Sequence, residues 1–528
     1  MSNCYDIAIV GSGFAGSLLG MIARKQGRSV VLIEKGTHPR VVIGESSTPL
    51  SNLLIEELAI RYDLPALLPF AKWGSWQQSH PEVACGLKRG FTFHHHVLGQ
   101  PSAPRADRQD QLLVAASPHY RIADTHWYRA DFDHFFLRQA QGLGADYVDE
   151  VALNGFLDCG DRVQLEGQRR NEPVRVTAKF VVDATGPRGF LHRALGLGEL
   201  PLPGMPHTQA LFNHFTGVGR LADGDHNRTV ETPPYPIDDA AVHHVFEGGW
   251  VWVLQFNNGI TSAGVAATGE VAAQLGFASG AGVWHRLCEL IPALKEQFAS
   301  AKPERSFAHI PRLGFRSASV TGNKWAMLPS AAGFVDPLLS TGFPLTLLGV
   351  SRLAAIIEKD WGSDAMAKSL ENYARETDAE LVAASRLIAA LYKNMDNFPV
   401  FVSLSLLYFA AASFSETARR LGKPHLAPSF LLHDHETFGP ACLQIFERAM
   451  QARTGSESPK LTQDILRAIG PINVAGLGDA VKRNWYPVDA EDLLRSAHKL
   501  DAGREEILAL LDRCGFSTDD AIAHAAAC

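Results

Sequence analysis

The chain has 528 residues, 46% of them hydrophobic and 20% charged, with a formal net charge of −7 at pH 7. This composition is typical of a globular protein with more than one domain. The negative charge argues against a nucleic-acid partner, because a phosphate-binding surface needs an excess of Lys and Arg. The seven cysteines are scattered and never spaced as CxxC, which favours a reducing compartment and gives no zinc site.

The N-terminal segment MSNCYDIAIVGSG enters a predicted strand at its fifth residue, without a basic stretch followed by an apolar one. We therefore expect no signal peptide and a cytoplasmic protein. The most apolar window, residues 398–414, contains serines and is shorter than the ~20 residues that cross a bilayer. It predicts a buried helix or a helical hairpin and no stable membrane insertion, with an acyl-chain or membrane contact as the alternative.

A dinucleotide-binding pattern opens the chain. Residues 5–10 (YDIAIV) predict a strand, a glycine turn follows at 11–16, and a second strand over 29–33 ends at an acid. In this pattern the first glycine allows a tight turn, the second lets a pyrophosphate approach the backbone, and the third lets helix and strand pack closely. The helix N-terminus attracts phosphates, and the acid accepts hydrogen bonds from ribose hydroxyls. The cofactor contacts expected here are Gly11, Gly13, Phe14, Ala15, Gly16, Glu34 and Lys35.

Two later segments indicate which dinucleotide is bound. Residues 179–186 (KFVVDATG) predict a strand ending in Ala184, Thr185 and Gly186, and residues 325–337 (WAMLPSAAGFVDP) predict a strand running into a glycine turn. With the first motif they resemble the FAD-binding framework of the glutathione-reductase-like flavoproteins. The resemblance implies FAD, with a late helix N-terminus beside the flavin ring. The chain has one GxGxxG motif and no CxxxxC pair, so we expect reduced flavin from a separate reductase, or transient binding of NAD(P)H.

Four stretches resemble the flavin-dependent halogenases, the tryptophan-halogenase-like family: GESSTPL at 44–50, WYRADFD at 127–133, GWVWVLQ at 249–255 and FVDPLLSTG at 334–342. The likeness runs from residue 5 to about residue 350 and implies a role in secondary metabolism. The flavin contacts that it implies are Glu45, Ser46, Ser47, Arg129, Asp336, Gly342 and Phe343. The residues that it places beside the halide and the flavin are Pro337, Ser340, Thr341 and Gly342.

Lys88 lies in the stretch GLKRGFTFHHH, residues 86–96, where the family carries a catalytic lysine. The resemblance implies that reduced FAD adds O2 to give a flavin hydroperoxide, which a chloride or bromide ion attacks. Hypohalous acid then travels to Lys88, and an electron-rich aromatic substrate attacks the halogen. A desolvated lysine suits this chemistry, because its ammonium is a strong donor and its pKa falls readily. The alternative is a solvated strand lysine beside Arg89.

The alternation of a regular strand predicts which side chains share a face with Lys88. One face would carry Phe91, Phe93 and His95, and the other Lys88, Gly90, Thr92, His94 and His96. Adjacent histidines on opposite faces do not make a metal site, and we expect no metal. We expect the substrate pocket to contain His94 and His96 together with Trp250 and Trp252, whose spacing puts both indoles on one face.

The chain departs from the family pattern at three places. Leu254 and Gln255 replace the Ile-Pro that follows W-x-W in the family. Ser330 stands where many relatives carry an acid that bonds the ribityl chain, and Leu339 replaces a glutamate of the tryptophan halogenases. The loss of that glutamate favours a phenol- or pyrrole-type substrate, free or bound to a carrier protein, over an indole. The loss of Ile-Pro keeps two alternatives open: a halide-independent flavin monooxygenase that hydroxylates or epoxidises, and a flavin-dependent double-bond reductase.

We expect an α/β fold in three parts. A discontinuous, Rossmann-like FAD-binding domain takes residues 1–75, 120–200 and 305–375. A mostly antiparallel substrate-side sheet takes residues 76–119 and 201–304. Residues 376–528 form a C-terminal helical domain that completes the substrate cavity, because segments there carry apolar residues at helical spacing.

Overall fold

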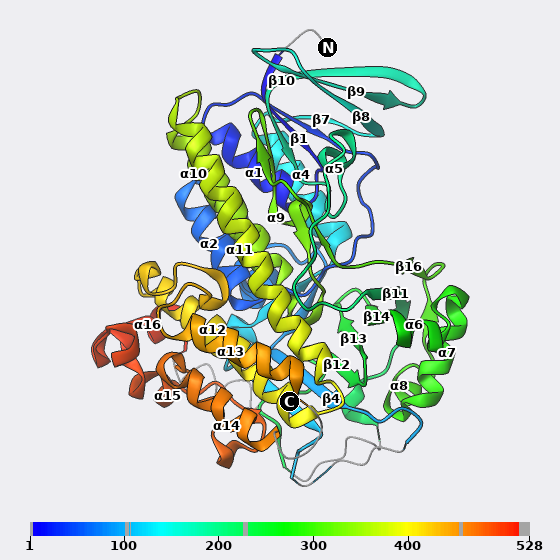
Figure 1. The fold of residues 1–528 in the computed structure, drawn as a ribbon, viewed down its shortest axis with the longest axis vertical. Helices are drawn as coiled ribbons and strands as arrows, with labels where there is room; N and C mark the ends of the chain where they lie inside the picture. Colours follow the sequence, from blue (N-terminus) through cyan, green and yellow to red (C-terminus); the bar gives the residue numbers. More distant parts are fainter. Residues whose placement is uncertain (1–3, 101–104, 106, 225–230, 453–457, 517–528) are drawn as a thin grey trace.

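The computed structural model describes residues 4–100, 105, 107–224, 231–452 and 458–516. It contains two large sheets and many helices, so the expected α/β class is confirmed. Figure 1 shows one sheet at the top of the view, the second at the lower right, and the C-terminal helices at the lower left. The long helices α10 (Gly342–Lys359) and α11 (Ala365–Lys393) run between these parts.

The first sheet is built on parallel strands. Its strands are β1 (Cys4–Val10), β2 (Val30–Ile33), β7 (Asp146–Val148), β8 (Val151–Asp158), β9 (Val163–Arg169), β10 (Glu172–Asp183), β18 (Thr321–Gly322) and β19 (Trp325–Met327). The order is β18-β19-β10-β1-β2-β7, and the antiparallel strands β8 and β9 extend it from β10. Every residue of β2 is buried, as expected for a parallel strand covered by helices on both faces. The carboxyl ends of β1 and β10 pair side by side, so the glycine turn after β1 meets the ATG segment after β10.

The second sheet is antiparallel except where β4 pairs with β12 and β5 with β21. Its strands are β4 (Gly90–His95), β5 (Gln111–Ala115), β11 (Thr208–Thr216), β12 (Ala241–Phe246), β13 (Gly249–Gln255), β14 (Ile260–Thr268), β15 (Lys302–Pro303), β16 (Ala308–Ile310) and β21 (Trp485–Tyr486). The order is β15-β11-β14-β13-β12-β4-β5-β21, with β16 also on β11. Three helices cover one face on the right of Figure 1: α6 (Gly269–Leu275), α7 (Ala281–Leu290) and α8 (Pro292–Gln297). Phe215 of β11 packs there against Trp284 and Phe298, with ring centroids 5.1 and 5.2 Å apart.

The C-terminal helices cover the other face. They are α12 (Phe398–Arg420), α13 (Phe438–Gln451), α14 (Ser458–Ile469), α15 (Ala490–Arg495) and α16 (Arg504–Cys514). Phe401 and Phe409 of α12 lie against Phe93 and Phe91 of β4, with ring centroids 5.9 and 5.1 Å apart. The apolar window is therefore one long helix and not a hairpin. Residues 338–359 and 398–420 are long and apolar enough to cross a membrane, but 72% and 83% of their apolar windows are buried inside the protein, as in core helices.

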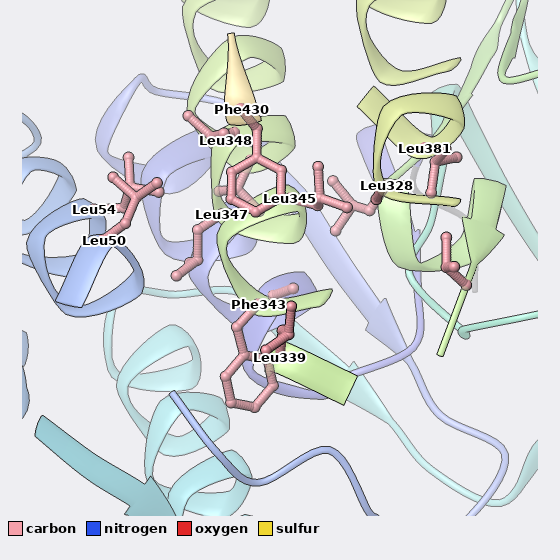
Figure 2. Close-up of a cluster of buried hydrophobic side chains, with 14 of the residues drawn as sticks. Leu50, Leu54, Leu328, Leu339, Phe343, Leu345, Leu347, Leu348, Leu381 and Phe430 are labelled. Atoms are coloured by element: carbon pink, nitrogen blue, oxygen red, sulfur yellow. The ribbon is translucent and has the colours of Figure 1, made fainter. Parts of the chain in front are cut away.

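The remaining elements connect the two sheets. The helices are α1 (Phe14–Lys25), α2 (Pro49–Arg61), α3 (Trp73–Ser79), α4 (Arg129–Gly142), α5 (Phe190–Ala194) and α9 (Pro329–Ala332). Two short antiparallel pairs join β3 (Cys85–Lys88) to β6 (Asp124–Trp127) and β17 (Phe315–Arg316) to β20 (Gly333–Phe334). Leu50 and Leu54 of α2 face Leu347 and Leu348 of α10 in the buried cluster of Figure 2. This cluster fixes the start of α10 next to the first sheet.

The strands of the first sheet all come from the ranges expected for the FAD-binding domain. The second sheet also takes β16 from that range. It takes β21 from the range expected to be helical, so the C-terminal part is not purely helical. The long helix α11 crosses the expected boundary at residue 375. The division of the chain into domains at these boundaries stays a prediction.

Candidate active site

A cavity of about 500 Å³ is lined by the segments that follow strands of the first sheet and by strands of the second sheet. The glycine turn before α1, the GESS loop (residues 44–47) and Arg129 belong to its lining. Residues of β12 and β13 and the turn that precedes α10 also line it. The expected flavin contacts that line this cavity are Gly13, Phe14, Ala15, Gly16, Glu45, Ser46, Arg129, Ala184, Thr185, Gly186, Asp336, Gly342 and Phe343. Motifs that are far apart in the sequence thus meet around one space.

The glycine turn has the geometry of a phosphate cradle. Gly11 has φ +101°, and a Cβ there would lie 2.6 Å from the Ala184 carbonyl oxygen. A Cβ at Gly16 would lie 2.1 Å from the Gly11 carbonyl oxygen, so neither site accepts a side chain. Gly13 precedes α1 and has no side chain to cap the helix, and the Phe14 N–H donates to Asp133 Oδ1 at 3.2 Å. An added Cβ at Gly13 would lie 3.4 Å from Asp133 Oδ2 and 3.5 and 3.6 Å from the Nη2 atoms of Arg129 and Arg40, so two cations and one carboxylate flank this position.

The acid at the end of β2 is placed as the dinucleotide pattern requires. Glu34 Oε2 accepts hydrogen bonds from the Ser12 N–H and hydroxyl at 3.1 Å each, and from Arg40 Nη2 at 3.2 Å. Burial alone would raise the pKa of Glu34, but Arg40 and these donors outweigh it and hold the pKa below its ordinary value. Glu34 and Gly11 do not belong to the cavity lining, and Lys35 is exposed. Their contact with a cofactor stays a prediction.

The turn before α10 forms part of the cavity lining. Pro337, Ser340, Thr341 and Gly342, the residues expected beside a halide, all line it. Leu339 and Ser340 take the left-handed conformation, with φ 62° and 56°, which is uncommon for such side chains. The backbone N–H of Leu338 donates to Asp336 Oδ1 at 3.1 Å and braces the turn. α10 then begins without a side-chain cap among the described residues. Because its first residues line the cavity, its N-terminal N–H groups lie next to this space.

Asp336 connects this turn to the second sheet. Its Oδ2 accepts a hydrogen bond from the Tyr392 hydroxyl at 2.9 Å, and that hydroxyl accepts one from Trp250 Nε1 at 3.1 Å. All three residues are buried. Burial raises the pKa of Asp336 to about 7, although the Leu338 N–H and the Tyr392 hydroxyl favour the ionised form. The first tryptophan of the W-x-W stretch therefore holds a carboxyl group in place at the cavity wall.

The GESS loop is fastened on both sides. Glu45 Oε1 pairs with His214 Nε2 of β11 at 2.8 Å, and both side chains are buried. Its carbonyl oxygen accepts from the Trp127 N–H at 2.6 Å. Arg129 Nη1 donates to the Gly44 carbonyl oxygen at 2.9 Å and makes a two-pronged ion pair with Asp133 at 2.7 and 2.8 Å. The loop is thus tied to the second sheet and to the start of α4.

Lys88 is fully buried behind this loop. Its side chain has 0% relative exposure, which excludes the alternative of a solvated strand lysine. Nζ donates to Ser46 Oγ at 2.8 Å and to the Ser47 carbonyl oxygen, and it lies 3.8 Å from the ring centroid of Phe91. Burial lowers the pKa of Lys88 to about 7, while Asp124 opposes the change. Lys88 and Ser47 do not line the cavity, but Ser46 does, so one hydroxyl separates the ammonium group from it.

The strand that was expected to run through Lys88 is interrupted at Arg89. Its N–H donates to the Asp239 carbonyl oxygen at 2.6 Å, and its guanidinium group donates to the carbonyl oxygens of Ser117 and Pro118. β3 ends before this residue and β4 begins after it. The predicted division of faces is therefore wrong, because Lys88 and Phe91 come together instead of pointing apart.

The same interruption decides where the histidines lie. His94 stacks on His244 with centroids 6.1 Å apart, and His96 Nε2 contacts His244 Nδ1 at 2.9 Å. Neither His94 nor His96 lines the cavity, so the structure does not bring them into the expected pocket. Trp250 and Trp252 do line it, and they are joined by His243, a residue that the sequence analysis missed.

His243 lies on β12 between the cavity and the aromatic side chains of β4. Its ring stacks on Phe93, with centroids 4.4 Å apart, and its Nδ1 contacts the Thr92 carbonyl oxygen at 3.2 Å. Burial lowers the pKa of His243 to about 3, so the ring is neutral and Nδ1 is the donor of this bond. The sequence offered only a histidine pair in an apolar strand, which is more typical of a core. Other cavity residues that the sequence analysis missed are Arg40, Val42, Ile43, Arg188 and Arg312.

Comparison with known proteins finds the same family that the sequence motifs resemble. A protein-family model described as tryptophan halogenase matches residues 104–398, and a model of an NAD(P)-binding Rossmann-like domain matches residues 9–50. The chain is 30% identical over 364 residues to monodechloroaminopyrrolnitrin halogenase PrnC of Pseudomonas fluorescens, across 68% of this chain and 62% of that protein. It therefore spans slightly less than two thirds of the length of this relative.

Two further proteins resemble this chain over a larger share of their own length. Tetracycline 7-halogenase of Kitasatospora aureofaciens is 27% identical over 423 residues, across 77% of this chain and 73% of that protein. The crystal structure of a single-residue variant of halogenase PltM in complex with FAD covers 91% of this chain and 99% of its own, at 25% identity and a TM-score of 0.80. The family resemblance indicated by the sequence motifs is confirmed: because the family model matches more than half of the residues, the chain belongs to the tryptophan halogenase family.

Proposed function

We propose that this chain is a flavin-dependent halogenase that uses FAD, O2 and a halide to halogenate an electron-rich aromatic substrate, with Lys88 as the catalytic lysine. The observation that carries the proposal is a fully buried lysine whose ammonium group is bound to Ser46, a residue of the cavity wall. A lysine is rarely buried without a reason, because removing an ammonium group from water costs several kcal/mol. Here the burial places a strong donor one hydroxyl away from the cavity.

The residues that line the cavity fit FAD. The α1 N-terminus, Arg40 and Arg129 suit the pyrophosphate, since two guanidinium groups lie close to Gly13 at the start of this helix. The N-terminus of α10 suits an anion beside the ring system. When bound in its reduced form, FAD would supply the electrons that reduce O2, and the reduced oxygen would oxidise a halide to hypohalous acid. The carrier of those electrons to FAD is proposed to be a separate reductase.

The protein side chains have three tasks in this proposal. Pro337, Ser340, Thr341 and Gly342 hold the halide at the helix N-terminus. Trp250, Trp252 and His243 close the cavity on the side of the second sheet and exclude water. Water exclusion is required because free hypohalous acid would otherwise diffuse away. Lys88 then holds hypohalous acid with the one N–H that is not engaged by Ser46 and Ser47.

The substrate is proposed to be a phenol- or pyrrole-type ring. Leu339 is fully buried at the turn before α10, where the tryptophan halogenases carry a glutamate, and it lies beside Phe343 in Figure 2. A leucine supplies no base to the substrate ring, so the substrate must bring its own activating hydroxyl or ring nitrogen. The aromatic side chains Trp250, Trp252 and His243, which line the cavity, suit a flat aromatic substrate.

The departure at Gln255 has a local structural reason. Gln255 is the last residue of β13 and pairs with Thr261 of β14. Its carbonyl oxygen is so close to Gly86 that a Cβ there would lie 2.1 Å away. A proline at this position could not donate a backbone hydrogen bond. Gln255 lies next to β3, the strand that carries Lys88.

The experiment supplies purified protein with FAD, a flavin reductase, NADH, O2 and either bromide or chloride, together with a panel of phenols and pyrroles, free or attached to a carrier protein. Mass spectrometry identifies the products. Halogenated product that is lost in Lys88→Ala would support the proposal. Oxygenated product that forms equally well without halide would replace it with a monooxygenase, and reduction of a double bond without O2 would replace it with a reductase.

A further inference from the structure

Asp124 stands directly opposite Lys88 in the small sheet behind the GESS loop. In the antiparallel register of β3 and β6, Lys88 pairs with Asp124. Directly opposed residues of an antiparallel pair project from the same face, with their Cβ atoms about 4.5–5.5 Å apart. Both side chains are buried, Lys88 at 0% and Asp124 at 6% relative exposure. The ammonium and carboxyl groups are therefore neighbours away from solvent, although the structure records no hydrogen bond or ion pair between them.

Only one of the two carboxyl oxygens of Asp124 accepts a hydrogen bond from the described residues. Its Oδ1 accepts from Asn52 Nδ2 at 2.7 Å, and Asn52 is itself buried in the first turns of α2. Its Oδ2 is buried and has no hydrogen-bond partner among the residues that the structure describes. An unpaired carboxylate oxygen in such a place costs free energy unless a charge or a proton compensates it. The one-sided support by Asn52 therefore fixes the carboxyl group and leaves its second oxygen available.

Few other charged groups among the described residues influence the pKa values of Lys88 and Asp124. From α12, Glu416 and Arg420 act on Asp124, but they form an ion pair with each other at 2.7 Å. From β6 and β12, His126 and His243 face Lys88, and burial holds the pKa of each far below its ordinary value, so both rings are neutral. Burial is the main cause of the lowered pKa of Lys88, and Asp124 is the charged neighbour that opposes it. In agreement with this, burial lowers the pKa of Lys88 and raises the pKa of Asp124, so the two approach each other.

We propose that Asp124, oriented by Asn52, is a positioning residue whose charge is coupled to the protonation of Lys88 and so sets the form in which the lysine meets the oxidised halogen. The inference rests on the proposed function, because it assigns Lys88 to hypohalous acid. With the proton on Lys88, the ammonium group donates a hydrogen bond to hypohalous acid. With the proton on Asp124, the amine attacks the halogen, an N–halogen bond replaces an N–H bond, and water leaves.

The test follows the protonation of Lys88 directly, in the full-length enzyme with FAD bound and the lysines labelled with ¹³C at Cε. The Lys88 signal is the one that is missing from Lys88→Met. Asp124→Asn keeps the shape and removes the charge that stabilises the ammonium group, so the Lys88 titration midpoint should fall by about one pH unit or more. The apparent pKa that Lys88 contributes to the pH–rate profile of halogenation should fall by a similar amount. Asp124→Glu, which keeps the charge, should restore part of the shift.

A second variant keeps the test valid if Asp124→Asn does not fold. Asn52→Ala removes the donor to Oδ1, so Asp124 holds the shared proton more firmly and the Lys88 midpoint should fall by a smaller amount. Asp110→Asn is the matched control, because burial also raises the pKa of Asp110, whereas the charges acting on it are those of Arg105 and Asp107. It should leave the Lys88 midpoint unchanged.

Two results separate this inference from the proposed function. If Asp124→Asn and Asn52→Ala both keep the wild-type Lys88 midpoint, the inference is overturned, even though loss of halogenation in Lys88→Ala would still support the proposed function. If Lys88→Ala halogenates as fast as the wild type, the proposed role of the lysine fails instead, whatever its titration shows.

Discussion

Trp250 donates its indole N–H to the hydroxyl of Tyr392 over 3.1 Å, and so joins the second sheet to helix α11. The same hydroxyl donates to Asp336 in the turn before α10. One phenol group thus aligns three segments that are far apart in the chain: β13, α11 and the turn on which the halide position is proposed. The geometry of that turn depends on this hydroxyl group as well as on its own backbone.

Tyr392→Phe should destabilise the protein and weaken FAD binding. The change leaves Asp336 Oδ2 and Trp250 Nε1 buried without their partner, which costs about 1–3 kcal/mol for each such group. Urea unfolding measures the stability, and quenching of flavin fluorescence measures the binding. Tyr408→Phe on α12 is the control, since Tyr408 is a buried tyrosine whose pKa is raised by burial alone. Equal effects of the two changes would contradict the special role of Tyr392.

The stability of the protein without FAD should carry a pH dependence from Asp336. Burial raises the pKa of this group from 3.8 to about 7, so the folded protein binds the proton more tightly than the unfolded chain. Its contribution to stability is therefore fully present below about pH 4 and is lost as the pH rises through 7. Urea unfolding between pH 4 and 8 measures the unfolding free energy of the wild type and of Asp336→Asn. As the pH rises, the wild type should lose stability relative to the variant. A difference that is constant across this range would contradict the assignment.

His214→Ala should loosen the GESS loop. The change leaves Glu45 Oε1 buried without its partner at 2.8 Å, and the loop then loses its tie to β11. We expect FAD to dissociate about tenfold more readily, which corresponds to about 1.4 kcal/mol. The measurement is the dissociation constant of FAD. His309→Ala, an exposed histidine on the neighbouring β16, should leave that constant unchanged.

Gly16→Ala should prevent FAD binding. The added Cβ would lie 2.1 Å from the Gly11 carbonyl oxygen, so the glycine turn and α1 would have to separate. The flavin content of the purified protein, read from its absorption spectrum, is the measurement. Gly142→Ala at the end of α4, where a Cβ meets nothing within 4 Å, is expected to retain full flavin content and to gain up to ~1 kcal/mol of stability.

The sequence predicted the cofactor side of this site well, because its signals are local. A glycine that must avoid the Ala184 carbonyl oxygen, or a helix that starts at Gly342 without a cap, leaves a recognisable motif. The burial of Lys88 was also foreseeable from the motifs around it. Its surroundings were not, because Asp124 and Asn52 approach it from segments whose pairing the sequence does not specify.

The sequence failed where a single residue changes the register. The period of a strand is two residues, so a break at one position moves all later side chains to the other face. Arg89 makes that break by donating to carbonyl oxygens outside the strand. For this reason Lys88 meets Phe91, and His94 and His96 lie against His244 instead of in the cavity. His243 escaped notice because a buried histidine in an apolar strand carries no distinguishing pattern.

The two-residue strand β21 has a consequence for the order in which the molecule assembles. Trp485 and Tyr486 pair with Leu113 and Val114, and so cover the outer edge of β5. An uncovered strand edge is a template for pairing with other chains. The two partners are 372 positions apart in the chain, so during synthesis this edge stays open until the ribosome has reached Trp485. A polypeptide that stops before Trp485 would therefore be exposed to aggregation through β5, even though it contains every residue of the cavity.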